Sequence, residues 1–341
     1  MDELLKWRDE FPILKTTTYL ISNSLGAMPR GASRALEEYA RAWATRGVRA
    51  WEEGWWEMAA ALGDQIAPII GAEPGTISLH ANVTLTQAVI ASCFDFQGPR
   101  CKVVLADKEF PSILYFWHAQ RRRGAEIRLV RTEEDPIRVP TEKLLAAIDE
   151  RTLLVPLSHV LFRSAYVQDV PKIVAKAQRV GAHVILDAYQ SAGVLPVEAR
   201  KWHVDFVVGG ALKWLCGGPG VAYLYVRPDL HKQLKPALTG WVAHPRPFEF
   251  EVGPGALRED AFRFLSGTPH IPAFYAARPG DHPPGGRGTH PRAVRAVNAP
   301  VDREGARAGL ASSHPRGRTR TRRHRDACRA ARPGSPGRVV A

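Results

Sequence analysis

Six short apolar segments alternate along this chain with longer segments of helical periodicity. The apolar segments are KVVLAD (102–107), AEIRLV (125–130), LLVPLSHV (153–160), AHVILDA (182–188), DFVVGG (205–210) and VAYLYV (221–226). Apolar residues recur at helical spacing in 32–46, 55–70, 83–94, 112–123, 141–149 and 169–180. Nearly continuous apolar strands separated by helices predict an α/β fold with a mostly parallel sheet covered on both faces. Thr141 is the expected N-cap of its helix.

The composition changes sharply after Arg278. Residues 279–341 contain 14 Arg, no Lys and four acidic residues, so about +10 of the net charge of +13 lies in this part of the chain. The same segment has eight Pro and nine Gly, and Leu310 is its only large apolar residue. Such a segment cannot bury enough apolar surface to offset its ordering entropy. The sequence therefore predicts a globular region up to about residue 278, followed by a disordered tail.

Several classes of protein are excluded by the remaining composition. No apolar run reaches the roughly 20 residues of a membrane helix, and the N-terminus MDELLKWRDEF is too charged for a signal or transit peptide. The four cysteines form no CxxC pair, which argues against a zinc site and against a disulfide framework. We expect a cytoplasmic protein with no membrane partner and no metal.

Polar residues follow the predicted strands, where ligands of parallel sheets bind. They include Asp107, His159, Arg163, Asp187, Gln190 and Lys213. Lys213 precedes the glycine-rich CGGPG (216–220), and Asp187 ends an earlier strand. A lysine that can form a Schiff base, together with an acid that pairs with a pyridinium nitrogen, predicts a pyridoxal 5′-phosphate site. The helix opening at Asn82-Val83-Thr84 offers backbone N–H groups for the phosphate.

Six motifs carry a resemblance to a known family, from about Tyr19 to Arg278. ILDAYQSAGVLPV (185–197), GGALKWLCGGPG (209–220) and FLSGTPHIPA (264–273) resemble class V aminotransferase-fold enzymes. NSLGAMP (23–29), DKEFPS (107–112) and TGWVAHP (239–245) are similar to the kynureninase-like branch. The resemblance implies a fold-type I enzyme with a seven-stranded, mostly parallel sheet. It also implies an N-terminal segment at 1–45, a cofactor-binding large domain at 46–278 and a tail at 279–341.

The resemblance also implies roles for individual residues. Lys213 matches the Schiff-base lysine and catalytic residue, and Asp187 matches the partner of the pyridinium nitrogen. Thr84 and the backbone of Val83 match the phosphate-binding turn, and Phe110 matches the aromatic residue that covers the cofactor ring.

Trp241 and Thr268 match residues that reach the cofactor phosphate of the other subunit, which implies a homodimer. The substrate implied by the resemblance is an amino acid.

Two further cofactor-binding positions differ from the kynureninase pattern. Kynureninases similar to this chain have histidine where Gln190 stands and tyrosine where Leu212 stands. A leucine can neither bind the phosphate nor move a proton. The predicted function is therefore a kynureninase-like hydrolytic C–C cleavage, with a class V aminotransferase as the alternative. A third alternative is a homologue that keeps the fold without catalysis.

Each candidate residue also has a structural interpretation. Lys213 alone would be a surface lysine, Asp187 a helix cap, Gln190 a polar filler and Phe110 a core residue. His159 is expected to be hydrogen-bonded locally, and Arg163 could bind a carboxylate or form a salt bridge. Cys216 is expected to be a buried structural thiol, and the alternative is a persulfide-forming cysteine. Trp51, Trp55 and Trp56 are expected to pack in a core or dimer interface.

The basic tail has three interpretations. RGRTRTRRHR (316–325) could contact nucleic acid phosphates, the tail could be a linker, or it could be translated in a shifted frame. With GC-favouring codons, reading one base later from Asp281 gives a continuous string with amphipathic helical spacing and then a strand. We favour the frameshift and expect no nucleic-acid partner. The family's arginine for the substrate carboxylate would then be lacking, and activity would be impaired.

Overall fold

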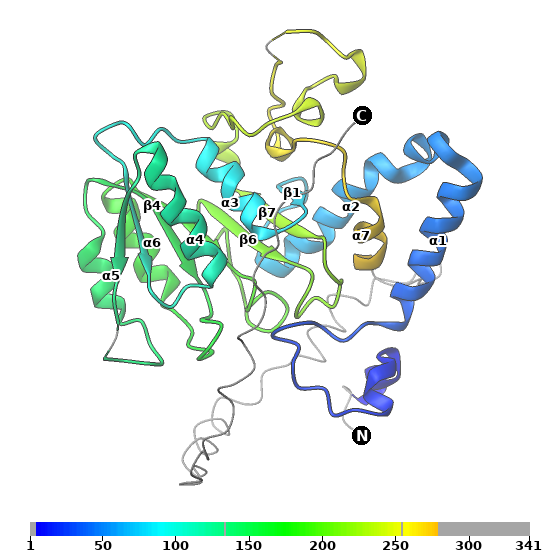
Figure 1. Cartoon of the computed structure of the whole chain (residues 1–341), viewed down its shortest axis with the longest axis horizontal. Helices are drawn as coiled ribbons and strands as arrows, with labels where there is room; N and C mark the ends of the chain where they lie inside the picture. Colours follow the sequence, from blue (N-terminus) through cyan, green and yellow to red (C-terminus); the bar gives the residue numbers. More distant parts are fainter. Residues whose placement is uncertain (1–4, 133, 254, 279–341) are drawn as a thin grey trace, which may run out of the picture. The chain divides into compact units, whose positions relative to one another are not determined.

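The computed structural model describes residues 5–132, 134–253 and 255–278, which lie in one compact unit. Seven strands form one sheet in the order β1-β7-β6-β5-β4-β2-β3 (Figure 1). Their bounds are β1 Ile77–His80, β2 Lys102–Ala106, β3 Glu126–Val130, β4 Thr152–Ser158, β5 His183–Asp187, β6 Phe206–Gly210 and β7 Ala222–Val226. The predicted α/β fold with a seven-stranded sheet is confirmed.

The sheet is parallel except for one strand. β2 pairs in parallel with β3 and β4, and β4, β5 and β6 continue in the same direction. β7 is antiparallel to both of its neighbours, β6 and β1. The sequence analysis found six of these strands and missed β1, because ISLH is too short to show a periodicity.

Seven α-helices accompany the sheet in the described part of the chain. They are α1 Arg30–Arg46, α2 Trp56–Ile66, α3 Val83–Ser92, α4 Pro111–Ala119, α5 Thr141–Ala147, α6 Val170–Arg179 and α7 Ile271–Ala277. The predicted helix at 55–70 is α2 followed by a short 3₁₀ turn, Ala67–Ile70. The predicted cap at Thr141 is wrong: the N-cap is Pro140, and Thr141 is already the first helical residue. A residue with helical backbone cannot turn its side chain back to the free N–H groups of the first turn.

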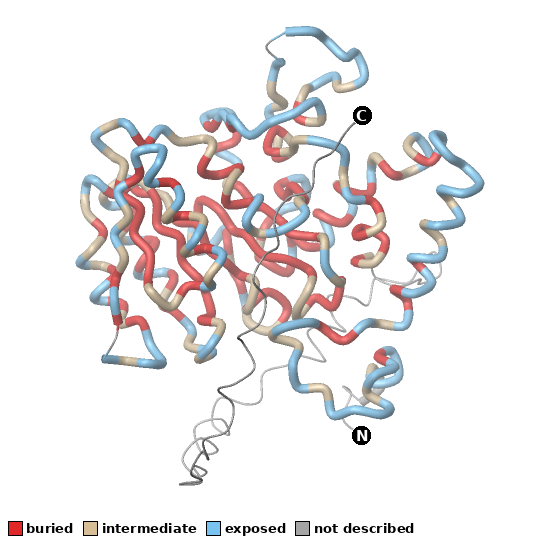
Figure 2. Tube along the Cα trace, in the orientation of Figure 1, coloured by how far each residue is buried: buried red, intermediate tan, exposed pale blue. Residues whose placement is uncertain are grey.

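Alternating side chains of each strand enter two separate apolar layers. In β2, Val103 and Leu105 pack in the layer that includes residues of α3 and α4. Val104 and Ala106 point the other way, into the layer that contains residues of α2, α5, α6 and α7. Buried residues therefore follow the strands and the inner helix faces (Figure 2). Two-sided burial explains why these strands read as continuous apolar runs.

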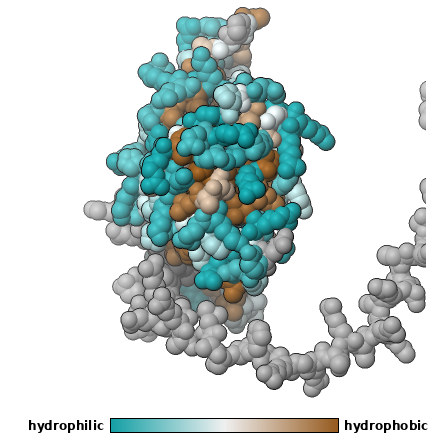
Figure 3. All heavy atoms as spheres, turned by 90° about the vertical axis from the view of Figure 1, so that its left-hand side faces the viewer, coloured by the Kyte–Doolittle hydropathy of each residue, from teal (hydrophilic) through white to brown (hydrophobic). Residues whose placement is uncertain are grey.

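The edge strand β3 is protected by charge. Exposed and half-buried side chains alternate along its first four residues, and Glu126 and Arg128 are the exposed ones. Figure 3 faces the side of the molecule on which α5 lies and shows hydrophilic groups around smaller apolar areas. Charged side chains on an edge strand discourage pairing with another chain. Within the described ranges, no helix has both the length and the apolar character needed to cross a bilayer.

Candidate active site

A cavity of about 210 Å³ lies at the carboxyl edge of the sheet. Its walls come from the ends of β4 and β5, the first turns of α3 and α4, and the loop after β6. The lining residues are Asn82, Val83, Thr84, Phe110, Ser112, Ile113, Ser158, Val160, Phe162, Asp187, Tyr189, Gln190, Leu212 and Lys213. Seven of the nine predicted site residues therefore line one cavity, although they come from four separate segments.

Lys213 lies close to two aromatic rings in this cavity. Its Nζ is 4.8 Å from the centre of the Tyr189 ring and 5.6 Å from that of Phe110. Burial lowers the pKa of Lys213, while the charge of Asp187 acts in the opposite direction. A lysine with a lowered pKa is a better nucleophile near neutral pH, because more of it is unprotonated.

Asp187 ends β5, and only 8% of its surface is exposed. Its Oδ1 accepts a hydrogen bond of 2.8 Å from the backbone N–H of Tyr189. Burial raises the pKa of Asp187 to about 6, although this hydrogen bond and the charge of Lys213 both favour the ionised form. A buried carboxyl with so few partners is suited to pair with a cation brought by a ligand.

The first turn of α3 forms the opposite wall. Asn82 is the N-cap, and its Oδ1 accepts from the backbone N–H of Leu85 at 3.0 Å. The amides of Val83 and Thr84 open the helix, where N–H groups have no intrahelical acceptor. A helix N-terminus beside a cavity is suited to an anion such as a phosphate.

The N-terminal segment supports the lysine loop from outside. Gln190 Nε2 donates to the backbone oxygen of Asn23 at 3.0 Å, and Gln190 Oε1 accepts from Trp214 Nε1 at 3.0 Å. The amide of Gly26 donates to the oxygen of Leu212 at 2.9 Å. A Cβ atom on Gly26 would lie 2.1 Å from the oxygen of Lys213, so only glycine permits this approach. The segment 23–29 thus fixes the backbone that carries Lys213.

Three aromatic or polar residues in the cavity were missed by the sequence analysis. Phe162 meets Phe110 edge-on, with ring centres 5.1 Å apart. Tyr189 contacts Lys213, and Ser158 lies beside Asp187 in the sheet. The available signal was that Ser158 and Asp187 are polar residues at the ends of two apolar strands. Which residues of the two strands lie opposite each other cannot be read from either strand alone.

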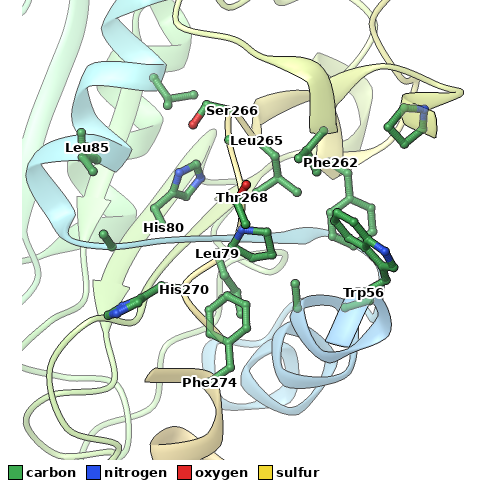
Figure 4. Close-up of a pocket in the computed structure, with 18 of the residues that line it drawn as sticks. Trp56, Leu79, His80, Leu85, Phe262, Leu265, Ser266, Thr268, His270 and Phe274 are labelled. Atoms are coloured by element: carbon green, nitrogen blue, oxygen red, sulfur yellow. The ribbon is translucent and has the colours of Figure 1, made fainter. Parts of the chain in front are cut away.

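Trp241 and Thr268 lie outside this cavity. Thr268 lines a second cavity of about 430 Å³, together with Trp56, Leu79, His80 and Phe274 (Figure 4). Trp241 meets the Trp56 ring edge-on at 5.4 Å and stacks on Phe250 at 6.0 Å. Their assignment to the cofactor of a partner subunit stays a prediction.

The weaker candidates do not line the cofactor cavity. His159 is 5% exposed, and its Nδ1 has no hydrogen-bond partner among the described residues; burial lowers its pKa to about 4. The guanidinium of Arg163 lies over the ring of Phe162 at 5.4 Å. Burial raises the pKa of Cys216 to about 11, so this thiol is protonated and unreactive at neutral pH.

Trp55 is buried and donates to the Tyr275 hydroxyl at 3.2 Å, as expected of a packing residue.

The residues of the first cavity fit pyridoxal 5′-phosphate. The Lys213 amine interacts with a buried carboxyl and lies near two aromatic rings, and a helix N-terminus in the wall of the cavity offers an anion site. The amine can condense with an aldehyde, the carboxylate can accept a hydrogen bond from a protonated pyridine nitrogen, and the helix N–H groups can donate to a phosphate.

Comparison with known proteins gives the same assignment. A family model described as aminotransferase class-V matches residues 18–279, so the match ends where the composition changes. The chain is 34% identical to the uncharacterized aminotransferase YcbU of Bacillus subtilis, over 80% of this chain and 70% of that protein. It is 32% identical to the kynureninase of Burkholderia pseudomallei, over 79% of this chain and 65% of that protein. The match thus spans about two thirds of the kynureninase.

Solved structures confirm the fold. The cystine C–S lyase C-DES in complex with cysteine persulfide has a TM-score of 0.68 at 24% identity, covering 78% of this chain and 71% of that one. The apo cysteine desulfurase of Thermococcus onnurineus has a TM-score of 0.70 at 20% identity, covering 86% and 71%. The class-V family match confirms the prediction that pyridoxal 5′-phosphate is the cofactor.

Proposed function

This chain belongs to the class-V aminotransferase family, and we propose that it acts on an amino acid in the cavity around Lys213. The observation that supports this most directly is the position of the Lys213 amine, which lies close to two aromatic rings and interacts with the buried Asp187. We propose a kynureninase-like hydrolysis as the reaction, because the kynureninase similarity extends over most of the described residues.

The residues of the cavity divide the task of holding the cofactor. Lys213 would bind it covalently, Asp187 would pair with its ring nitrogen, and Phe110 would cover its ring. Val83 and Thr84 would bind its phosphate at the start of α3. When bound, pyridoxal phosphate supplies an aldehyde that condenses with amines and a ring that withdraws electrons from the adjacent carbon.

Lys213 is also the base that this site offers to a substrate. Its lowered pKa allows it to take a proton from the carbon that bears the substrate amine. Asp187 would be ionised beside a cation, and its charge would favour the protonated form of the cofactor's ring nitrogen.

A second candidate, amino-group transfer, is favoured by Leu212. This residue lines the cavity where kynureninases similar to the chain have a tyrosine. Leucine provides no hydroxyl to move protons during hydrolysis. Gln190 is engaged with Asn23 and Trp214, which fits a structural role better than an acid–base role. The relative YcbU carries the name of an aminotransferase.

The protein with its present tail is proposed to be impaired. The family match ends at residue 279, and residues 279–341 lie outside the described part of the chain. We propose a shifted frame after Arg278, with loss of the arginine that would bind the substrate carboxylate. A homodimer and a cytoplasmic location belong to the same proposal, and no nucleic-acid partner is proposed.

Product analysis tests the proposal. The cofactor-loaded chain and a version with the frame restored after Arg278 are incubated with kynurenine or with an amino acid plus a keto acid. Alanine and anthranilate indicate hydrolysis, whereas a new keto acid and the pyridoxamine form of the cofactor indicate transfer. If the restored chain gives neither with any amino acid, the proposed function is wrong. Steady turnover by the 341-residue chain would contradict the proposed impairment.

A further inference from the structure

A second buried acid lies next to the cavity. Glu109 directly precedes Phe110 and is 2% exposed. Its Oε2 accepts hydrogen bonds from the backbone N–H of Ser158, at 3.0 Å, and from the Ser158 hydroxyl. Its Oε1 is buried and has no hydrogen-bond partner among the residues that the structure describes. None of the roles proposed above uses this carboxyl.

Ser158 connects this acid to the cavity. It lines the cavity and is the register partner of Asp187 at the ends of β4 and β5. Gln168 Nε2 donates to the Ser158 oxygen at 2.6 Å, which fixes the backbone of the serine. The Ser158 hydroxyl is therefore held between the Glu109 carboxyl and the space that the cofactor would occupy.

We propose that Glu109 is a positioning residue that acts through Ser158: by holding or releasing one proton, it decides whether the Ser158 hydroxyl donates to the cofactor or accepts from it. This inference rests on the proposed cofactor site.

When Glu109 is ionised, Oε2 accepts a hydrogen bond from the Ser158 hydroxyl, and the oxygen lone pairs of Ser158 face the cavity. When Glu109 is protonated on Oε2, it donates to Ser158 Oγ and frees the hydroxyl proton to point into the cavity. A proton on Oε2 has an acceptor at hand, because the Ser158 hydroxyl oxygen already lies within hydrogen-bond distance of Oε2.

The charges around Glu109 place this change near neutral pH. Burial raises the pKa of Glu109 to about 7, the hydrogen bonds from Ser158 act against this, and the charge of Asp187 raises the pKa further. The Gln168 amide also interacts with the carboxyl and favours the ionised form. Behind Asp187, the facing titratable groups are Lys213, Tyr189 and Tyr223.

The test follows the absorption spectrum of the bound cofactor between about pH 5.5 and 8.5. A spectral change with a midpoint near 7 is expected in the wild-type protein. Glu109→Gln cannot titrate, and Ser158→Ala has no hydroxyl, so both should lose this change or move its midpoint by at least about one pH unit. Ser158→Thr should keep it, because the hydroxyl remains. Asp205→Asn, at a buried acid outside the cavity, is the matched control and should also keep it.

An unchanged midpoint in Glu109→Gln or Ser158→Ala would overturn the proposal. A second measurement needs no cofactor: the thermal midpoint of the apoprotein is compared at about pH 5 and 8. Wild type should lose stability relative to Glu109→Gln as the pH rises, because the native state of the wild type must release an extra proton. If the thermal midpoints of wild type and Glu109→Gln change equally between the two pH values, the proposal is also overturned. If wild type binds no cofactor but the apoprotein curves diverge, the proposed function fails while the titration of Glu109 stands.

Discussion

Two buried aspartates, which lie at opposite ends of the central strands β5 and β6, differ in how fully their charge is compensated. Asp205 precedes β6 and is 3% exposed. Its Oδ2 accepts from the amide of Val184 at 2.8 Å, and its Oδ1 lies 3.0 Å from His183 Nδ1 and 3.2 Å from a guanidinium nitrogen of Arg227. Asp187, at the other end of β5, has one backbone hydrogen bond and the nearby charge of Lys213.

The difference separates a structural acid from a reactive one. An acid whose oxygens are all engaged holds strands together and has no capacity left for a ligand. An acid that is buried with too few partners has a raised pKa, as Asp187 does, and gains most when a ligand brings a cation. Burial alone therefore does not distinguish a functional acid from a structural one, whereas the partners do.

The largest expected effect is on chemistry at Lys213. Turnover, here and for the variants below, refers to the chain with the frame restored after Arg278. In that chain Lys213→Ala should lower the turnover of any amino acid by at least about 10³-fold, because both the covalent attachment and the base are lost. Borohydride reduction followed by mass spectrometry should show a cofactor adduct on the wild type and none on the variant. Lys108→Ala is the control. Lys108 also follows the carboxyl end of a strand, β2, and its amine donates to the backbone oxygen of Thr132. An adduct that persists in Lys213→Ala would assign the site to another lysine.

Exchanging the two aspartates for asparagine is the direct test of the comparison. Asp205→Asn should lower the free energy of unfolding by about 3–5 kcal/mol, because it leaves Arg227 and His183 without their buried partner. Its activity per folded molecule should be retained. Asp187→Asn should abolish activity while costing little stability. Urea unfolding and turnover, measured on both variants, check this. Equal losses of stability in the two variants would remove the distinction between them.

The pH dependence of stability sharpens the same point. The pKa of Asp187 is raised to about 6 in the folded apoprotein from its usual 3.8, so the native state holds an extra proton between these values. Wild type should therefore lose about 2 kcal/mol relative to Asp187→Asn as the pH rises from 4 to 7. Denaturant titrations of both apoproteins at intervals of pH measure the difference. A difference that grows in the opposite direction would mean that Asp187 is stabilised as an anion.

The smallest effect is expected at Cys216, three residues after the lysine. Its thiol is buried under the N-terminal segment, close to Gly26, and burial raises its pKa to about 11. Cys216→Ala should cost about 1 kcal/mol of stability, from lost packing, and leave turnover unchanged. Turnover before and after treatment with a thiol-blocking reagent provides a second measurement. Inhibition of wild type but not of Cys216→Ala would give this thiol a role in the reaction.

Much of the fold was predictable because its strands are buried on both faces. Continuous apolar runs marked β2 to β7, and helical spacing marked most helices to within a few residues. β1 was not found, because four residues carry too little pattern. The cap at Thr141 was misplaced, because the exact start of a helix depends on backbone geometry that Pro140 sets.

The site was predictable where function depends on residue type at a strand end. Lys213 and Asp187 stood out as a lysine and an acid after neighbouring strands, and the structure places them in one cavity. Tyr189, Ser158 and Glu109 were not found, because their relevance depends on which side chains meet across strands. Ser158 becomes a neighbour of Asp187 only through the register of β4 and β5.

The sequence by itself determined the alternation of strands and helices, the break in composition after Arg278, and the residue types available for chemistry. Only the tertiary structure decided which buried acid is left short of partners. That outcome depends on the sum of interactions from distant segments: His183 and Arg227 reach Asp205, whereas Asp187 faces a cavity. Local sequence sets secondary structure through spacing and burial, but the electrostatic environment of a group is set by every segment that packs against it.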